Sequence, residues 1–228
     1  MKPIRNLKWI IASTLVAVAG IPAATASEIF DNAANNRPAF SVGAAYEYST
    51  PVEQDFHTSG ISLGSRSGMS AGIAIGAPLW KNMYLEPGLS IFESQYSVEG
   101  RKLYGKPLNF IWIMGARLNC MLGYHFDFSE RWRLNITTGP QLAIGFSSGA
   151  HYPGKKSDNT LYDLGASYIR RVDLFWGAGV SVTYSRHYTV GFNFSRGLLN
   201  MSTDFENGYD APFHFREQII GVSAAYTF

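Results

Sequence analysis

The chain has 228 residues, a length that suits a single all-β domain. Charged residues make up only 16% of it, against roughly 25% in ordinary soluble proteins, while 14% are aromatic and 23 are glycine. A water-facing surface normally needs more charge. The first 26 positions hold three basic and no acidic residues, so without them the 19 Lys+Arg fall to 16, against 17 Asp+Glu. The resulting net charge of −1 excludes the basic footprint of a nucleic-acid-binding protein.

The first 26 residues are predicted to be a signal peptide. Basic residues precede an apolar run over residues 9–21, and small residues lead to a cleavage point between Ala26 and Ser27. The run is shorter than the roughly 20 residues that a transmembrane helix requires. We therefore expect an exported protein, with residues 27–38 as a short lead and residues 39–228 as one domain.

Eight segments of the expected domain alternate in polarity with a period of two. They cover residues 40–49, 61–77, 83–94, 108–124, 132–146, 171–184, 188–195 and 216–228. Successive side chains of a strand point to opposite faces, so each segment is predicted to be a strand with two unlike faces. Several segments exceed the roughly 9–11 residues that a tilted membrane strand needs.

The connections between these segments alternate in length. Short turns are expected near residues 78–82, 127–131 and 185–187, and longer polar connections near residues 50–60, 97–106, 147–167 and 197–214. Short and long connections therefore belong to opposite ends of the sheet. Within the fifth segment, Gly139-Pro140 predicts a bulge, because proline removes a ladder donor.

The composition of the polar face of each segment indicates whether the apolar face points inward, as in a soluble barrel, or outward to lipid. The polar face carries mainly Gly, Ser, Asn and Thr, whereas the outside of a soluble barrel would be rich in charges. Small residues suit the crowded lumen of an eight-stranded barrel. The few charges on this face have both signs: Glu47, Glu86, Asp173 and Glu217 against Arg117, Arg133 and Arg171. Since an unpaired buried charge is costly, we expect a paired and hydrogen-bonded network inside the lumen.

Aromatic residues gather at both ends of the apolar runs. Trp80, Tyr124, Phe126, Trp132, Tyr184, Tyr188 and Phe228 lie near the short turns, and Tyr46, Tyr48, Phe110, Phe146 and Phe194 lie near the long connections. Two such belts are typical of the two interfaces of a bilayer. The predicted fold is an all-β, eight-stranded, antiparallel, up-and-down transmembrane β-barrel, with the single cysteine, Cys120, on the lipid-facing side.

Three stretches of the sequence carry a family resemblance. The segment "RRVDLFWGAGVSVTYSRHYTVGFNFSRGLLN", the segment "TTGPQLAIGF" and the terminal Tyr226-Thr227-Phe228 resemble the PorT-type outer membrane β-barrel family of Gram-negative bacteria. The resemblance spans roughly residues 39–228 and implies an outer membrane location with both termini in the periplasm. It also implies that the barrel-assembly machinery reads Phe228, together with Tyr226, as an assembly signal. One member of that family is linked to protein secretion.

Catalytic and metal-binding patterns are weak in this sequence. The His-x-Ser arrangement of a lipid A deacylase occurs only at His57-Thr58-Ser59, in the first long connection, where a polar loop is the better interpretation. The acidic stretch "STDFENGYDA" misses the spacing of a calcium-binding EF-hand loop. The histidines lack metal-ligand spacing. We therefore predict no enzyme activity, no metal and no cofactor.

Three classes of function fit this interpretation. The first is a structural or surface-interaction barrel whose long extracellular loops contact unidentified molecules while a polar network plugs the lumen. The second is a narrow passive pore, and the third is a lipid-modifying outer membrane enzyme. The expected partners are the outer membrane bilayer and the barrel-assembly machinery, with no nucleic acid.

Overall fold

The computed structural model describes residues 38–55, 61–100, 110–151, 159–160, 170–201 and 214–228. The strands are β1 (Ala39–Asp55), β2 (Ile61–Trp80), β3 (Met83–Gly100), β4 (Phe110–Asp127), β5 (Trp132–His151), β6 (Asn159–Thr160), β7 (Val172–Tyr184), β8 (Tyr188–Gly197) and β9 (His214–Thr227). None of the described residues belongs to a helix long and apolar enough to cross a membrane.

Eight of these strands close into an antiparallel barrel. Each strand pairs with its neighbour along the chain, and β9 returns to pair with β1, with Ser41 opposite Thr227. The two-residue β6 only extends the edge of β5, where Gly149 lies opposite Thr160. The prediction of an eight-stranded up-and-down barrel is therefore confirmed. Closure satisfies the backbone groups that an open sheet edge would leave unpaired in hydrocarbon.

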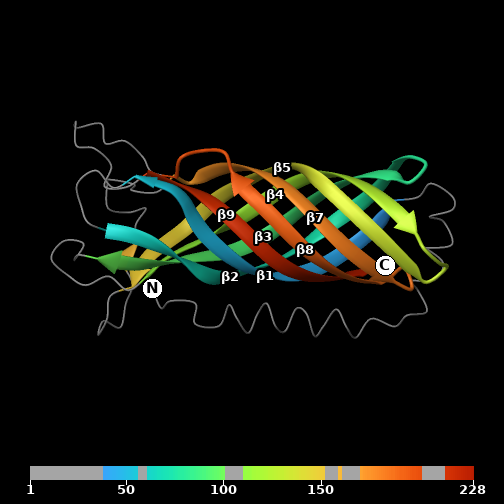
Figure 1. Cartoon of the computed structure of the whole chain (residues 1–228), viewed down its shortest axis with the longest axis horizontal. Helices are drawn as coiled ribbons and strands as arrows, with labels where there is room; N and C mark the ends of the chain where they lie inside the picture. Colours follow the sequence, from blue (N-terminus) through green and yellow to red (C-terminus); the bar gives the residue numbers. More distant parts are fainter. Residues whose placement is uncertain (1–37, 56–60, 101–109, 152–158, 161–169, 202–213) are drawn as a thin grey trace.

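The two ends of the barrel differ in the length of their connections. The turns β2–β3, β4–β5 and β7–β8 lie together at one end with the C-terminus (Figure 1). We call this the short-turn end and the opposite one the long-loop end. Lys81, Ser185 and Arg186 adopt the left-handed backbone conformation in two of the tight turns. At the long-loop end, β1 continues to Asp55, β3 to Gly100 and β5 to His151, so part of three expected long connections is strand.

The expected bulge at Gly139-Pro140 is wrong. Between β5 and β7 the register runs without a shift through Gly139, which lies opposite Gly177, and Pro140, which lies opposite Trp176. The irregularity between β4 and β5 falls instead at Met114 and Gly115. An outward-facing proline can occupy a regular strand position, because the only cost is one missing ladder hydrogen bond.

The two faces of the wall have the polarity expected for a barrel in lipid. Large apolar side chains such as Ile73, Leu118 and Val180 are 44–47% exposed on the outside. The alternating neighbours on the same strands point into the lumen, where Ser70 and Arg117 are buried. In water this outer surface would expose a continuous apolar band, whereas in a bilayer it is solvated by acyl chains.

The C-terminal residue takes part in closing the barrel at the short-turn end. The Phe228 backbone amide donates to the Phe40 carbonyl oxygen at 2.9 Å. Its ring lies 5.7 Å from the ring of Phe40 and 5.1 Å from that of Tyr226. Tyr226 in turn contacts Tyr188 at 5.3 Å. These rings form one arc of the expected aromatic belt at this end.

Candidate functional site: the barrel lumen

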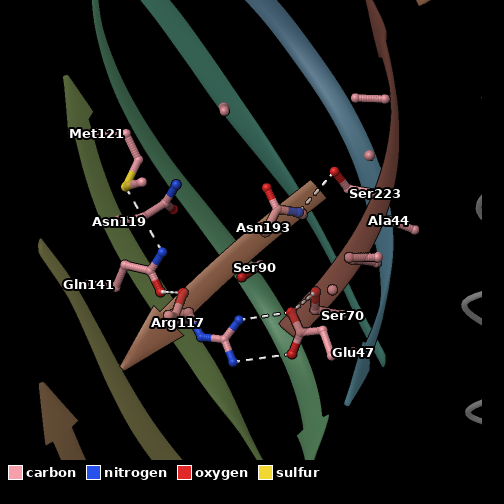
Figure 2. Close-up of a pocket in the computed structure, with 18 of the residues that line it drawn as sticks. Ala44, Glu47, Ser70, Ser90, Arg117, Asn119, Met121, Gln141, Asn193 and Ser223 are labelled. Atoms are coloured by element: carbon pink, nitrogen blue, oxygen red, sulfur yellow. Dashed lines mark hydrogen bonds and ion pairs between the residues drawn. The ribbon is translucent and has the colours of Figure 1, made fainter. Parts of the chain in front are cut away.

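A buried ion pair crosses the middle of the lumen. The Arg117 guanidinium donates from Nη1 to Glu47 Oε1 at 2.9 Å and from Nη2 to Oε2 at 3.3 Å. Ser70 adds a hydroxyl donor to Oε1 at 2.6 Å (Figure 2). The side chains of Arg117 and Glu47 are only 8% and 7% exposed. This two-pronged geometry is what a desolvated Arg–carboxylate pair requires to offset its loss of hydration.

Two further carboxylates are buried toward the long-loop end. Asp173 is 2% and Glu217 3% exposed. Asp173 Oδ1 accepts from the backbone amides of Leu174 and Leu199, whereas Asp173 Oδ2 and Glu217 Oε1 have no hydrogen-bond partner among the described residues. Both interact electrostatically with Arg117. Among the buried ionisable side chains of the described lumen, carboxyl groups thus outnumber guanidinium groups.

Glycine makes room for this carboxylate pair. A side chain at Gly197 would begin 2.8 Å from Asp173 Oδ2 and 3.0 Å from the Glu217 carbonyl oxygen. Both distances are too short for an ordinary Cβ contact. Only glycine therefore lets β8 pass between the Asp173 side chain and the backbone of β9.

A layer of buried apolar residues, here called the apolar layer, lies in the lumen at the long-loop end, beside the buried Asp173 and Glu217. Its ten buried residues are Leu63, Phe92, Tyr96, Ile111, Ile113, Ala143, Phe175, Met201, Phe215 and Ile219. Tyr96 is fully buried, and its ring meets that of Phe215 edge-on at 5.5 Å. The layer contacts the ion pair below it, because the Arg117 guanidinium lies 4.9 Å from the centre of the Phe92 ring. The inward positions of this half therefore form a packed core.

The segment after β8 contributes to the same layer. The Met201 amide donates to the Phe215 carbonyl at 2.9 Å, and the Met201 carbonyl accepts from the Arg170 amide at 2.8 Å. Met201 itself is 4% exposed. These two hydrogen bonds fix the segment across the ends of β7 and β9, so the Met201 side chain closes the apolar layer.

The short-turn half of the lumen is polar and contains a cavity of about 230 Å³. Its polar lining includes Ser90, Asn119 and Gln141. Asn193 Nδ2 donates to Ser223 Oγ at 2.9 Å (Figure 2). The cavity reaches the ion pair, since Glu47 and Arg117 also line it. This half has the size and the hydrogen-bonding groups to hold water.

The remaining members of the expected network lie apart from the ion pair. Glu86 lines the polar cavity. Arg133 does not reach Glu47: its Nε donates to Asp127 at 2.6 Å, at the short-turn end, where Asp127 is 49% exposed. Arg171 is exposed and precedes β7, so its expected place in the lumen is wrong. Arg171 lies before the first residue of β7, where alternation no longer fixes whether a side chain points inward.

Several sequence-predicted residues lie outside the described residues. They are the cleavage pair Ala26 and Ser27, the His57-Thr58-Ser59 arrangement and the acidic stretch at residues 202–211. Within the described residues no group of three or more His, Cys, Asp or Glu is placed to hold a metal ion.

Sequence reasoning missed the apolar layer. Ile111, Ile113 and Phe175 occupy lumen positions, although alternation assigns polar residues to that face. The available signal was the loss of alternation itself in "FIWIMG" and "LFW", where both faces are apolar. A continuous apolar run marks a strand that is covered on both faces, which here means lipid outside and packed core inside.

Solved outer membrane barrels resemble this chain at low sequence identity. Neisserial surface protein A is 12% identical with a TM-score of 0.45, and the match covers 84% of this chain and 97% of that one. OprG from Pseudomonas aeruginosa is 10% identical with a TM-score of 0.45, covering 85% and 97%. The outer membrane enzyme PagL is 13% identical with a TM-score of 0.39, covering 82% and 98%. No curated protein matches the sequence.

A family model matches a much larger part of the chain than any short motif could. The model describes an outer membrane protein beta-barrel domain, and it matches residues 32–203, which is more than half of the sequence. The matched region includes β1 to β8 of the closed barrel. The chain therefore belongs to the outer membrane protein beta-barrel domain family.

Proposed function

We propose that this protein is a non-conducting outer membrane barrel that acts through its long connections, in a structural or surface-interaction role. The apolar layer supports this proposal most strongly, because it replaces a water path with packed side chains. The Glu47–Arg117 pair lies directly below it and spans the lumen from β1 to β4. Ions crossing this barrel would have to displace both.

The proposed orientation puts the short-turn end in the periplasm and the long connections at the cell surface. Short periplasmic turns and longer extracellular loops are the usual arrangement in such barrels. Under this orientation Phe228 faces the compartment in which the barrel-assembly machinery works. The resemblance to the PorT-type family is consistent with it. We further propose that the protein has no catalytic role.

Channel recordings test the closed lumen. Purified protein in planar bilayers should give no steady conductance, whereas the double variant Ile113→Ala/Phe175→Ala, which empties the apolar layer, should conduct. The outward-facing double variant Leu118→Ala/Leu174→Ala serves as the matched control and should stay silent. Steady ion conductance by the unchanged protein would favour the passive pore instead.

Surface labelling tests the orientation. In a Cys120→Ala background, a membrane-impermeant maleimide should label Ser157→Cys on intact cells and leave Ser129→Cys unlabelled until the outer membrane is broken. Reversed labelling would refute the orientation. Mass spectrometry of lipids from cells with and without the protein tests catalysis, and a lipid whose acylation depends on the protein would identify an enzyme.

A further inference from the structure

The polar cavity of the lumen extends from the short-turn end of the barrel to the ion pair. Its lining begins at Ser41, which pairs with Thr227, the last residue of β9. At its other end it reaches Glu47 and Arg117, and above them Arg117 contacts the ring of Phe92 in the apolar layer. A solute entering at the short-turn end therefore meets the ion pair as the floor of the cavity.

The polar side chains on one side of this cavity hold one another. On β5 and β8, Ser195 Oγ donates to Gln141 Oε1 at 3.2 Å. On β8 and β9, Asn193 Nδ2 donates to Ser223 Oγ at 2.9 Å. These hydrogen bonds join neighbouring strands across the wall, so the amides and hydroxyls on this side are already engaged.

The polar side chains on β3 and β4 are not engaged in this way. Glu86, Ser90 and Asn119 line the cavity, and their side chains make no hydrogen bond or ion pair with any described residue. No dashed line reaches Asn119 or Ser90 in Figure 2. Asn119 lies opposite Gly88, where a Cβ atom would begin 2.7 Å from Asn119 Oδ1. The Asn119 carboxamide thus lies over Gly88, one inward position from Glu86 on one side and from Ser90 on the other.

Glu86 has no counter-ion among the described residues. The two cationic side chains nearest to it in the lumen are already paired, because Arg117 binds Glu47 at 2.9 Å and Arg133 binds Asp127 at 2.6 Å. The two buried carboxyl groups above the ion pair add to the negative potential. A narrow lumen with apolar walls concentrates such a potential, so the cavity attracts a cation.

Small residues keep the space beside Glu86 and Asn119 open. Ala74 lies opposite Gly88 on β2, and Ala45 of β1 lines the same cavity. The cavity of about 230 Å³ is far larger than the ~10–15 Å³ that one water needs. A small organic solute therefore fits, with water filling the rest.

We propose that this cavity binds a small primary amine, whose ammonium group donates to the Glu86 carboxylate and to the Asn119 carboxamide oxygen. An ammonium group has three N–H donors and no acceptor, and its hydrogen bonds to a carboxylate are strengthened by charge. The Ser90 hydroxyl supplies a further polar contact along the same wall. We call this the Glu86–Asn119 site.

The available ligands favour an ammonium group over a metal ion. Calcium takes six to eight oxygen ligands, and the described residues contain no group of three or more His, Cys, Asp or Glu placed to hold a metal. A single carboxylate with one amide and one hydroxyl oxygen suits the three donors of an ammonium group instead. Under the proposed orientation the site opens to the periplasm, but binding itself does not depend on orientation.

Titration of the full chain in neutral detergent with 4-amino-1-butanol tests the site, with NMR detection of the Asn119 side-chain amide. We expect saturable shifts in the unchanged protein and at least tenfold weaker binding by Glu86→Gln. The control Glu93→Gln removes the same charge from the same strand, between the buried Phe92 and Ser94 and therefore on the outer face, and should bind within twofold of the unchanged protein. Ala74→Leu narrows the cavity and should also weaken binding.

A neutral ligand of the same length sharpens the test. In 1,4-butanediol a hydroxyl replaces the ammonium group, so we expect at least tenfold weaker binding. Glu86→Asp keeps the carboxylate but shortens its reach, and an intermediate loss is expected. Heat-dependent gel migration confirms that each variant is folded.

Three results would overturn the inference. They are the absence of saturable shifts in the unchanged protein, binding of 1,4-butanediol as tight as that of the amine, and equal losses in Glu86→Gln and Glu93→Gln. The outcome is independent of the proposed function. A protein that binds the amine and also conducts ions would retain the Glu86–Asn119 site and refute only the closed lumen.

Discussion

The two halves of the lumen are occupied by different kinds of side chain. Toward the short-turn end, hydroxyl and amide side chains surround a cavity of about 230 Å³. Toward the long-loop end, ten buried apolar residues from six strands and the segment after β8 pack against one another. Glu47 and Arg117 lie at the boundary and contact both halves. One lumen can thus be polar around a cavity at one end and packed like a core at the other.

The lumen of this barrel is therefore divided into a packed core and a polar cavity. The apolar half obeys the rules of a soluble protein core, where lost volume is costly. The polar half tolerates change better, because water can replace a missing hydrogen-bond partner. Mutations matched between the halves should separate these two behaviours.

The largest effect is expected at the boundary. Arg117→Met leaves Glu47 buried without its cation and should lower the free energy of unfolding by about 3–5 kcal/mol. Urea unfolding in lipid vesicles, followed by heat-dependent gel migration, measures the change. Combining it with Glu47→Gln should restore most of the stability, since no unpaired charge remains. If Arg117→Met alone were as stable as the unchanged protein, the Glu47–Arg117 pair would not stabilise the boundary between the two halves.

In the apolar half, Phe175→Ala should cost about 3–4 kcal/mol, because a buried ring is replaced by a void. Its neighbour Leu174 faces outward on the same strand and provides the control. Leu174→Ala should cost less in the same vesicle assay, because acyl chains fill the space. Equal losses at the two positions would contradict the packed core.

The outer wall offers a contrast with both halves. Val180 is 44% exposed on the outside of β7, and Val180→Arg should cost about 2–4 kcal/mol if it lies near the bilayer midplane. Val180→Leu keeps the apolar surface and should be nearly neutral. The measurement is again vesicle unfolding, and a harmless arginine here would refute our assignment of the lipid-facing side.

The smallest effect belongs to the polar half. Asn193→Ala removes the hydrogen bond to Ser223 and should cost about 0.5–1.5 kcal/mol. Water in the adjoining cavity can satisfy the remaining hydroxyl. A loss as large as that of Phe175→Ala would mean that the polar half is packed as tightly as the apolar one, and the comparison between the halves would fail.

Much of the barrel wall could be predicted from the sequence. A strand between lipid and lumen alternates apolar and polar residues, and this period of two can be recognised in a single sequence. The pattern located all eight barrel strands and their outward faces. The pattern could not locate the apolar layer, because Ile111 and Phe175 pack against residues of strands that are distant in the sequence. The same limit applies to Arg171, which precedes β7, so that local contacts set the direction of its side chain.

The hydrogen bond from Phe228 to Phe40 has a consequence for the time course of assembly. It joins the last residue to the second residue of the first strand, so the seam between β1 and β9 forms from the most distant partners in sequence. Joining distant segments carries the greatest loop-closure cost, and such contacts slow folding. We therefore expect the pairing of β1 with β9 to form last. Until then, β1 and β9 are the two exposed edge strands of an open sheet.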